Sequence, residues 1–188
     1  VMEVTEAEDL RKVSLLSTPS SRLAVFRQHE QSSSNESSSV ILALDSVQDP
    51  GNMGTIIRTA DWFGVRKIIC SRETADVYNP KVVQATMGAI ARVKVEYCNL
   101  EDRLREMKNE GWAVYGTFLE GESIYDACLR KDKAVVIMGN EGKGVSEKIK
   151  QLVTDKLLIP SYPEGEATSE SLNVAIATGI VLSEFRRN

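Results

Sequence analysis

The chain contains 188 residues, enough to bury a hydrophobic core of its own. Apolar residues make up 42% of the sequence and charged residues 27%, which excludes a wholly disordered protein. The formal net charge of −4 argues against a basic coat over the whole surface, and hence against strong non-specific nucleic-acid binding by this chain alone.

Cysteine and histidine content limits the chemistry. The three cysteines, Cys70, Cys98 and Cys128, are scattered and form no CxxC motif, which indicates free thiols in a reducing compartment rather than disulfides or a zinc site. The single histidine, His29, excludes a metal site built on several imidazoles. No uncharged apolar run reaches the roughly 18 residues of a membrane helix, and the acidic first residues lack the apolar core of a secretory signal. We therefore expect a cytoplasmic protein with no membrane segment and no bound metal.

The composition changes sharply near residue 40. Residues 1–28 form a short mixed segment, whereas residues 29–39 contain six serines and no apolar residue, which predicts a flexible linker. The segment before the linker is too small to fold alone, so we expect it to be the end of another module. Residues 40–188 are expected to form one domain.

After residue 40, predicted strands alternate with predicted helices. The continuous apolar run Val40–Leu44 is typical of a strand buried on both faces. Apolar residues from Met53 to Phe63 recur at helical spacing, and Gly64 is expected to end that helix. Further strands are predicted at 67–70, 93–97, 112–118, 134–138 and 156–159, and further helices at 80–87, 99–110, 146–152 and 171–185. This alternation predicts an α/β fold with a mostly parallel sheet and helices on both faces.

Three segments interrupt this pattern, and each follows a predicted strand. Ligands of open α/β sheets bind beyond the carboxyl ends of strands, so these positions indicate a site. In the first segment, Asp49–Asn52 is typical of a turn, with Asn52 placed as the N-cap of the next helix. Arg58 lies off the apolar stripe of that helix, although a solvated surface arginine is the default explanation for one such residue.

The second segment, Gly139–Gly144, has the sequence G-N-E-G-K-G. Its glycines allow a ligand to approach the backbone closely, and Glu141 supplies a carboxylate. The spacing matches neither the dinucleotide fingerprint nor a P-loop, because Gly144 follows Lys143 where a P-loop has serine or threonine. A kinase or a nucleotide-binding switch therefore loses its main support. On this segment alone, a glycine-rich turn without a ligand explains the pattern equally well.

The third segment leads from the strand ending at Ile159 to the last helix. Ser171 is explained as an N-cap, but Asn173 is less easily explained that way. An amide in a helix that is apolar on nearly all sides needs a hydrogen-bonding partner. The helix itself is too apolar for a surface position, so we expect it to be buried in the core or between subunits.

Taken together, the three segments resemble the motifs of the SpoU/TrmH family. Its members are RNA ribose 2′-O-methyltransferases of the SPOUT superfamily and use S-adenosylmethionine. The resemblance covers about residues 38–187 in the right order, and three motifs are far more specific than one. The matching segments are Asn52–Arg58, Gly139–Gly144 and Ile159–Pro160 with Ser171–Val174; Gln84–Ala89 also resembles a family helix. Residues 2–26 resemble the end of the ribosomal-protein-like substrate domain that many members carry in front.

The resemblance implies a fold whose C-terminal part forms a trefoil knot, and a homodimer formed through the C-terminal helix. It also implies a pocket for S-adenosylmethionine, made largely by backbone groups of three loops. The implied cofactor-binding residues are Thr117, Gly139, Asn140, Gly144, Ile159, Ser161 and Leu172.

The implied reaction is methyl transfer to a ribose 2′-hydroxyl, with Arg58 as the principal catalytic residue. A guanidinium hardly ever loses its proton in a protein. We therefore expect Arg58 to bind the adjacent phosphate and to stabilise the developing alkoxide rather than to act as a base. By the same resemblance, four residues would orient Arg58 and the ribose: Asn52, Glu141, Ser171 and Asn173.

The RNA itself is expected to meet a basic patch assembled in space from Arg58, Arg66, Arg92 and Lys143. The linker and the remnant of a front module favour ribosomal RNA as the substrate. A transfer RNA ribose methyltransferase is the alternative within the same chemistry. A non-catalytic RNA-binding protein of the same fold is a third interpretation, which the presence of Arg58, Glu141 and Asn173 argues against.

Overall fold

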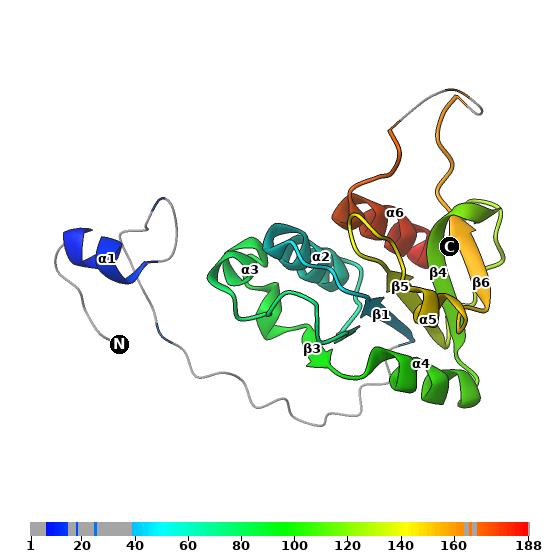
Figure 1. The fold of residues 1–188 in the computed structure, drawn as a ribbon, viewed down its shortest axis with the longest axis horizontal. Coiled ribbons are helices and arrows are strands. Elements are labelled where there is room, and N and C mark those ends of the chain that lie inside the picture. Colours follow the sequence, from blue (N-terminus) through cyan, green and yellow to red (C-terminus); the bar gives the residue numbers. More distant parts are fainter. Residues whose placement is uncertain are drawn as a thin grey trace. The chain divides into compact units, whose positions relative to one another are not determined.

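The computed structural model describes residues 7–14, 18, 25, 39–163, 166 and 169–187. The chain divides into two units, residues 1–34 and 35–188. In the first unit, helix α1 spans Ala7–Val13, with acidic residues in its first turn and basic residues in its last, as the helix dipole favours (Figure 1). The predicted serine-rich linker at 29–39 lies outside the described residues except for Ser39, as does most of the predicted remnant at 1–28.

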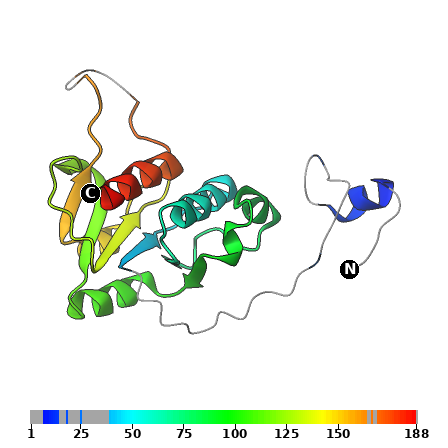
Figure 2. The same ribbon diagram turned by 180° about the vertical axis from the view of Figure 1, so that it is seen from behind.

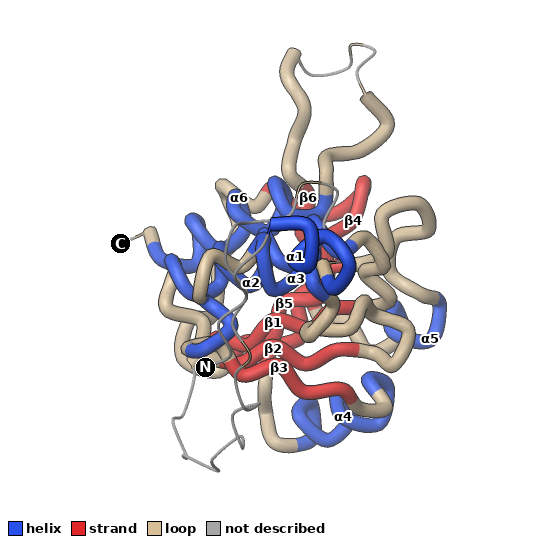
Figure 3. The backbone as a smooth tube through the Cα atoms, turned by 90° about the vertical axis from the view of Figure 1, so that its left-hand side faces the viewer, coloured by secondary structure: helices blue, strands red, loops and turns tan. Residues whose placement is uncertain are grey.

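A six-stranded parallel sheet with the order β3-β2-β1-β5-β4-β6 forms the centre of the second unit (Figures 1 and 3). The strands are β1 Val40–Leu44, β2 Lys67–Cys70, β3 Lys94–Tyr97, β4 Ala113–Ser123, β5 Ala134–Met138 and β6 Asp155–Leu158. Every residue of the central strands β1 and β5 is buried, which confirms the prediction made from their continuous apolar runs. The strand order reverses between β1 and β5, the point at which such sheets bind their ligands.

Helices cover both faces of the sheet, as predicted (Figure 2). Alternate residues of β1 point to opposite faces, so Leu42 and Leu44 pack with α2, α3 and α6, whereas Ile41 and Ala43 pack with α4 and α5. The helices are α2 Pro50–Trp62, α3 Pro80–Ala85, α4 Leu100–Asn109, α5 Glu147–Lys150 and α6 Val174–Arg186, with a short 3₁₀ helix η1 at Ala89–Ala91. None of the helices in the described part of the chain is long and apolar enough to span a membrane.

Strand β4 and helix α6 differ by three residues or more at one end from the sequence-based prediction, and several other elements differ by one or two residues. Strand β4 continues past its predicted end at Phe118 to Ser123, because it pairs with β6 on both sides of an irregularity between Thr117 and Glu122. A bulge of this kind lets a strand continue after its side-chain alternation has been broken. Helix α6 begins at Val174 rather than at Ser171, because Asn173 is its cap. The helix buries one face in the core, including Leu182 and Phe185, which confirms that part of its expected burial.

Helices α2 and α3 cross at very short range, at Gly54. A Cβ atom at this position would lie 2.4 Å from Cβ of Ala85 and 2.8 Å from the carbonyl oxygen of Val82. Only a residue without a side chain lets the two helices approach so closely. Because Gly54 lies two residues after Asn52, this contact fixes the part of α2 that carries the first sequence motif.

We predict that Gly54→Ala lowers the free energy of unfolding by about 1–3 kcal/mol, since α3 must move to admit the methyl group. The matched control is Gly179→Ala in α6, where the nearest atom lies 3.8 Å from the new Cβ. That change should be neutral or stabilising, by up to about 1 kcal/mol, because alanine is the better helix former. Urea denaturation measures both variants; a Gly54→Ala protein as stable as the original would contradict this account of the crossing.

Candidate functional site

The loops that follow β1 and β5 are joined by hydrogen bonds beyond the carboxyl ends of these strands. Nδ2 of Asn140 donates to the carbonyl oxygen of Ser46 at 2.7 Å. The Glu141 carboxylate accepts from the backbone N–H groups of Asp49 at 3.1 Å and Gln48 at 3.3 Å. The first two sequence motifs, more than 85 residues apart, therefore form one structural unit, as the rule for parallel sheets led us to expect.

The start of α2 corrects one prediction. The N-cap is Asp49, whose Oδ1 accepts from the backbone N–H of Asn52 at 2.7 Å, and not Asn52 itself. The reason is Pro50, which suits the first helical position because it has no N–H to be satisfied there. Asn52 therefore lies in the first turn of the helix, and its side chain is available for contacts outside it.

Three predicted site residues meet through the side chain of Asn52. Its Nδ2 donates to Oε1 of Glu141 at 3.1 Å, and its Oδ1 accepts from Nδ2 of Asn173 at 2.9 Å. Asn173 in turn caps α6, because its Oδ1 accepts from the backbone N–H groups of Ala175 at 2.9 Å and Ile176 at 3.3 Å. The N-cap of α6 is therefore Asn173 and not Ser171, which lies exposed two residues earlier. Asn173 thus both caps α6 and bonds to Asn52, which explains why an amide side chain precedes so apolar a helix.

Hydrogen bonds determine the charge state of Glu141. Partial burial acts to raise the pKa of its carboxyl group, but the bonds donated by Asn52, Asp49 and Gln48 outweigh this effect and lower the pKa below its ordinary value. At neutral pH Glu141 is therefore ionised, and its hydrogen bonds between the two loops are all formed. These bonds weaken only as the pH falls through the lowered pKa, where the carboxylate gains a proton and loses acceptor strength.

The loop after β5 is folded tightly on itself. The backbones of Asn140 and Gly144 exchange two hydrogen bonds of 2.9 Å, and Oδ1 of Asn140 accepts from the N–H groups of Gly142 and Lys143, both at 3.0 Å. A Cβ at position 139 would lie 2.3 Å from the backbone of Gly144, so only glycine fits there. Gly144 itself has a φ of 69°, which glycine adopts without steric cost.

The residues implied to hold a cofactor lie in or after the neighbouring strands β5, β4 and β6. Thr117 in β4 donates through Oγ1 to the carbonyl oxygen of Ile137 at 3.2 Å, beside the start of the loop at Gly139. Ile159 and Ser161 follow β6, which is the other neighbour of β4. Leu172, just before α6, is 51% exposed.

Arg58 lies apart from this hydrogen-bonded group. It is exposed on α2, about 9 Å along the helix axis from Asn52. Its guanidinium makes no hydrogen bond or ion pair within the described residues. Arg66 and Arg92, which the sequence placed in the same basic patch, both bind Asp61, at 2.6 and 2.7 Å. The bond from Arg92, with that from Arg66, holds the pKa of Asp61 below its usual range.

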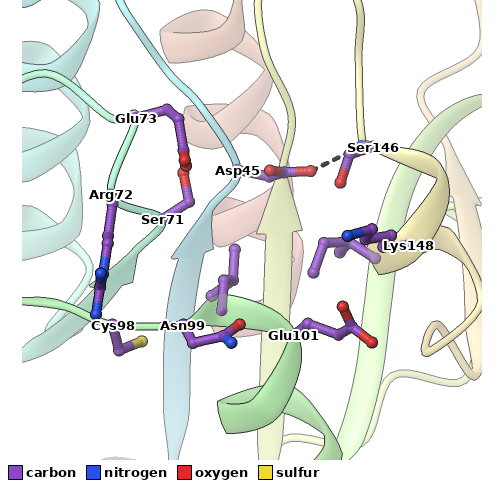
Figure 4. A pocket seen from close by; sticks show the side chains of 11 residues that line it. Asp45, Ser71, Arg72, Glu73, Cys98, Asn99, Glu101, Ser146 and Lys148 are labelled. Carbon is purple, nitrogen blue, oxygen red and sulfur yellow. Dashed lines mark hydrogen bonds between the residues drawn. The ribbon is translucent and has the colours of Figure 1, made fainter.

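A cavity of about 400 Å³ opens at the same edge of the sheet, on the side of α4 and α5 (Figure 4). Asp45, Ser71 and Ser146 line it, and Arg72 and Lys148 flank it with free-standing side chains. The sequence analysis missed Asp45. The sequence feature that could have indicated Asp45 is its position, as a carboxylate directly after a wholly apolar strand.

The parallel sheet, the reversal of strand order and the polar loops at one edge are features of the class of α/β proteins whose ligands bind beyond the strand ends. The chain belongs to the SpoU rRNA Methylase family, whose sequence model matches residues 39–183.

Relatives and solved structures agree with this assignment. The chain is 35% identical over 184 residues to the 23S rRNA (guanosine(2553)-2′-O)-methyltransferase RlmP of Bacillus subtilis, covering 97% of this chain and 68% of that protein. A TrmH-family structure from Porphyromonas gingivalis has 40% identity and a TM-score of 0.80, with 98% of this chain and 73% of that chain covered. An AdoMet-bound rRNA methyltransferase from Sinorhizobium meliloti has 37% identity and a TM-score of 0.73; the match covers 80% of this chain but only 57% of that one.

We predict that replacing Asn52 by alanine raises the pKa of Glu141, because the change removes a donor that favours the ionised carboxylate. An NMR titration of the Glu141 side-chain carbonyl resonance, assigned with Glu141→Gln, measures the effect. The matched control is Asn79→Ala, which removes the cap of α3 and should leave the titration unchanged. An unaltered midpoint in Asn52→Ala would show that the amide does not hold the carboxylate.

Proposed function

We infer that this chain transfers a methyl group from S-adenosylmethionine to the 2′-hydroxyl of a ribose in ribosomal RNA. The observation that carries this proposal is the hydrogen-bonded group of Glu141, Asn52 and Asn173 at the start of α2, with the exposed guanidinium of Arg58 about 9 Å further along the same helix, in a chain of the SpoU family. The relative from Bacillus subtilis, whose name specifies 2′-O-methylation of 23S rRNA, supports the choice of reaction and of RNA.

The proposed cofactor site is formed by the three loops at β4, β5 and β6. S-adenosylmethionine supplies a methyl group on a positively charged sulfur, ready for transfer to a nucleophilic oxygen. The chain offers backbone groups of the loop 139–144 and of Ser161, and the apolar side chains of Ile159 and Leu172. These match the polar and apolar parts of such a ligand. The AdoMet-bound relative from Sinorhizobium meliloti supports this choice of cofactor.

In the proposed mechanism, Arg58 binds the phosphate next to the target ribose and stabilises the negative charge that develops on the 2′-oxygen. Its planar group of donors suits both tasks. Ser171 and the amides of Asn52 and Asn173 orient the ribose. Glu141 stays ionised and acts as an acceptor that holds Asn52, rather than as a proton carrier. Exact placement of the reacting groups is the main source of rate acceleration in such a transfer.

We further propose that the C-terminal part forms the trefoil knot of SPOUT enzymes and that the protein acts as a homodimer through α6. The exposed side chains of Leu172 and Ile176 at the head of α6, with 51% and 57% of their surface accessible, support the dimer. Ribosomal RNA as substrate supports a cytoplasmic location. Arg58 and Lys143, which are unpaired within the described residues, would contribute to the RNA-binding surface.

The proposed activity can be tested with the purified chain, methyl-labelled S-adenosylmethionine, and ribosomal or transfer RNA. We expect label in ribosomal RNA, in dinucleotides that survive alkaline hydrolysis, because a 2′-O-methyl group blocks cleavage at the next phosphodiester. Label found in transfer RNA instead would show that transfer RNA, and not ribosomal RNA, is the substrate. Label recovered in mononucleotides, or no transfer despite cofactor binding, would contradict the proposed reaction.

We predict that Arg58→Ala and Arg58→Lys each lower kcat by about a hundredfold or more, with unchanged affinity for the cofactor. Lysine keeps the charge but cannot present the planar donors. Arg103→Ala on α4 is the matched control and should retain full activity. Steady-state rates with both RNA and cofactor at saturating concentrations measure the effect; wild-type rates in both Arg58 variants would remove this residue from the mechanism.

The dimer is tested by Ile176→Glu, which places a charge on the exposed face of α6. We predict that this variant sediments as a monomer while the unaltered chain sediments as a dimer, since an unpaired charge in an interface is costly. The control, Val83→Glu on the partly exposed face of α3, should not change the sedimentation coefficient. A dimer that survives Ile176→Glu would place the interface elsewhere.

A further inference from the structure

Two consecutive residues after β1 hold both ends of the loop after β5. The backbone N–H of Ser146, at the end of this loop, donates to Oδ2 of Asp45 at 2.7 Å (Figure 4). Near the start of the loop, Nδ2 of Asn140 donates to the carbonyl oxygen of Ser46 at 2.7 Å. The loop 139–146, which is expected to hold the cofactor, is thus attached at both ends to a single dipeptide.

Asp45 is an unusual residue in this position. It is 5% exposed and is the only acidic side chain among the buried residues of the described chain. It forms no ion pair within that part of the chain, and its bond to Ser46 Oγ is long, at 3.4 Å. A buried carboxylate is costly unless its hydrogen bonds are strong. The short hydrogen bond from Ser146 is therefore the principal interaction that compensates for the burial of Asp45. This bond joins Asp45 to the loop after β5.

The dipeptide itself is held in one conformation by a second group of buried hydroxyls. Ser46 has a φ of 60°, which is rare for a residue with a side chain and persists only where the surroundings impose it. Its N–H donates to Oγ of Ser71 at 3.0 Å. Thr74, beside Ser71, donates to the carbonyl oxygen of Leu44 at 3.2 Å. The end of β1 is therefore a fixed base on which the loop after β5 is mounted.

We propose that Asp45 is a positioning residue for the cofactor. By accepting a hydrogen bond from the N–H of Ser146, Asp45 fixes the backbone conformation of the loop 139–146. Because Glu141 belongs to this loop, Asp45 thereby also fixes the position of the Glu141 carboxylate. Asp45 acts through this loop, and no contact of its own with cofactor or RNA is required. The proposal rests on the proposed function, since it assigns the loop to cofactor binding.

The test compares Asp45→Ala, Asp45→Ser and Asp45→Asn. Alanine has no acceptor, and serine is too short to reach the N–H of Ser146. Asparagine fits both contacts, because its Oδ1 accepts from Ser146 and its Nδ2 can donate to Oγ of Ser46. We expect calorimetry to show about a tenfold or greater loss of S-adenosylmethionine affinity for alanine and serine, and recovery for asparagine. RNA affinity, measured without cofactor, should fall by a smaller factor than cofactor affinity, because Arg58 lies on α2 outside the loop and only Lys143 lies within it.

A matched control and a second measurement separate this proposal from the proposed function. Asp61→Ala removes a carboxylate at the far end of α2 and should leave cofactor affinity unchanged, whatever its effect on melting temperature. Hydrogen exchange of the amides from Asn140 to Ser146 should become faster in Asp45→Ala and Asp45→Ser but not in Asp45→Asn. If the unaltered chain binds no S-adenosylmethionine, the proposed function fails, and the exchange data still test Asp45. Normal cofactor affinity, or unchanged exchange, in the alanine and serine variants would overturn the positioning role.

Discussion

The site depends on one carboxylate, that of Glu141, which accepts three N–H donors from the segment that follows β1. Two of these donors are backbone groups of the turn before α2 and the third is the amide of Asn52. These bonds act together with those from Asn140 to Ser46 and from Ser146 to Asp45, which join the same two loops. As a result, the first turn of α2, the glycine-rich loop and the head of α6 have fixed relative positions. The orientation of Asn173 follows from that arrangement.

Asparagine is suited to this arrangement because its amide both donates and accepts. Nδ2 of Asn52 donates to Glu141, and its Oδ1 accepts from Asn173. Nδ2 of Asn173 donates to Asn52, and its Oδ1 accepts from the first turn of α6. An aspartate at either position could serve as a cap or an acceptor but could not pass on a hydrogen bond. The two amides therefore connect two helix N-termini, which lie far apart in the sequence, to one anion.

The sequence predicted the sheet and its helices well, because burial alone determines where a run such as Val40–Leu44 can lie. It also brought Asn52, Glu141 and Asn173 into one site through their places after strands. It was wrong about the caps of α2 and α6. The choice between Asp49 and Asn52 depends on Pro50, and the choice between Ser171 and Asn173 depends on a partner 121 residues away. Asp45 was missed because a carboxylate that follows a strand in the sequence does not by itself indicate a role. Its burial and its hydrogen bond from Ser146 are visible only in the structure.

The crossing of α2 and α3 at Gly54 restricts how this sequence can change over time. A Cβ atom at position 54 would lie 2.4 Å from Cβ of Ala85, so the crossing has no room for a side chain on α2. A larger residue at position 54 must push α3 away from the helix that carries Asn52 and Arg58. Relatives that keep the same helix crossing are therefore expected to keep glycine at this position.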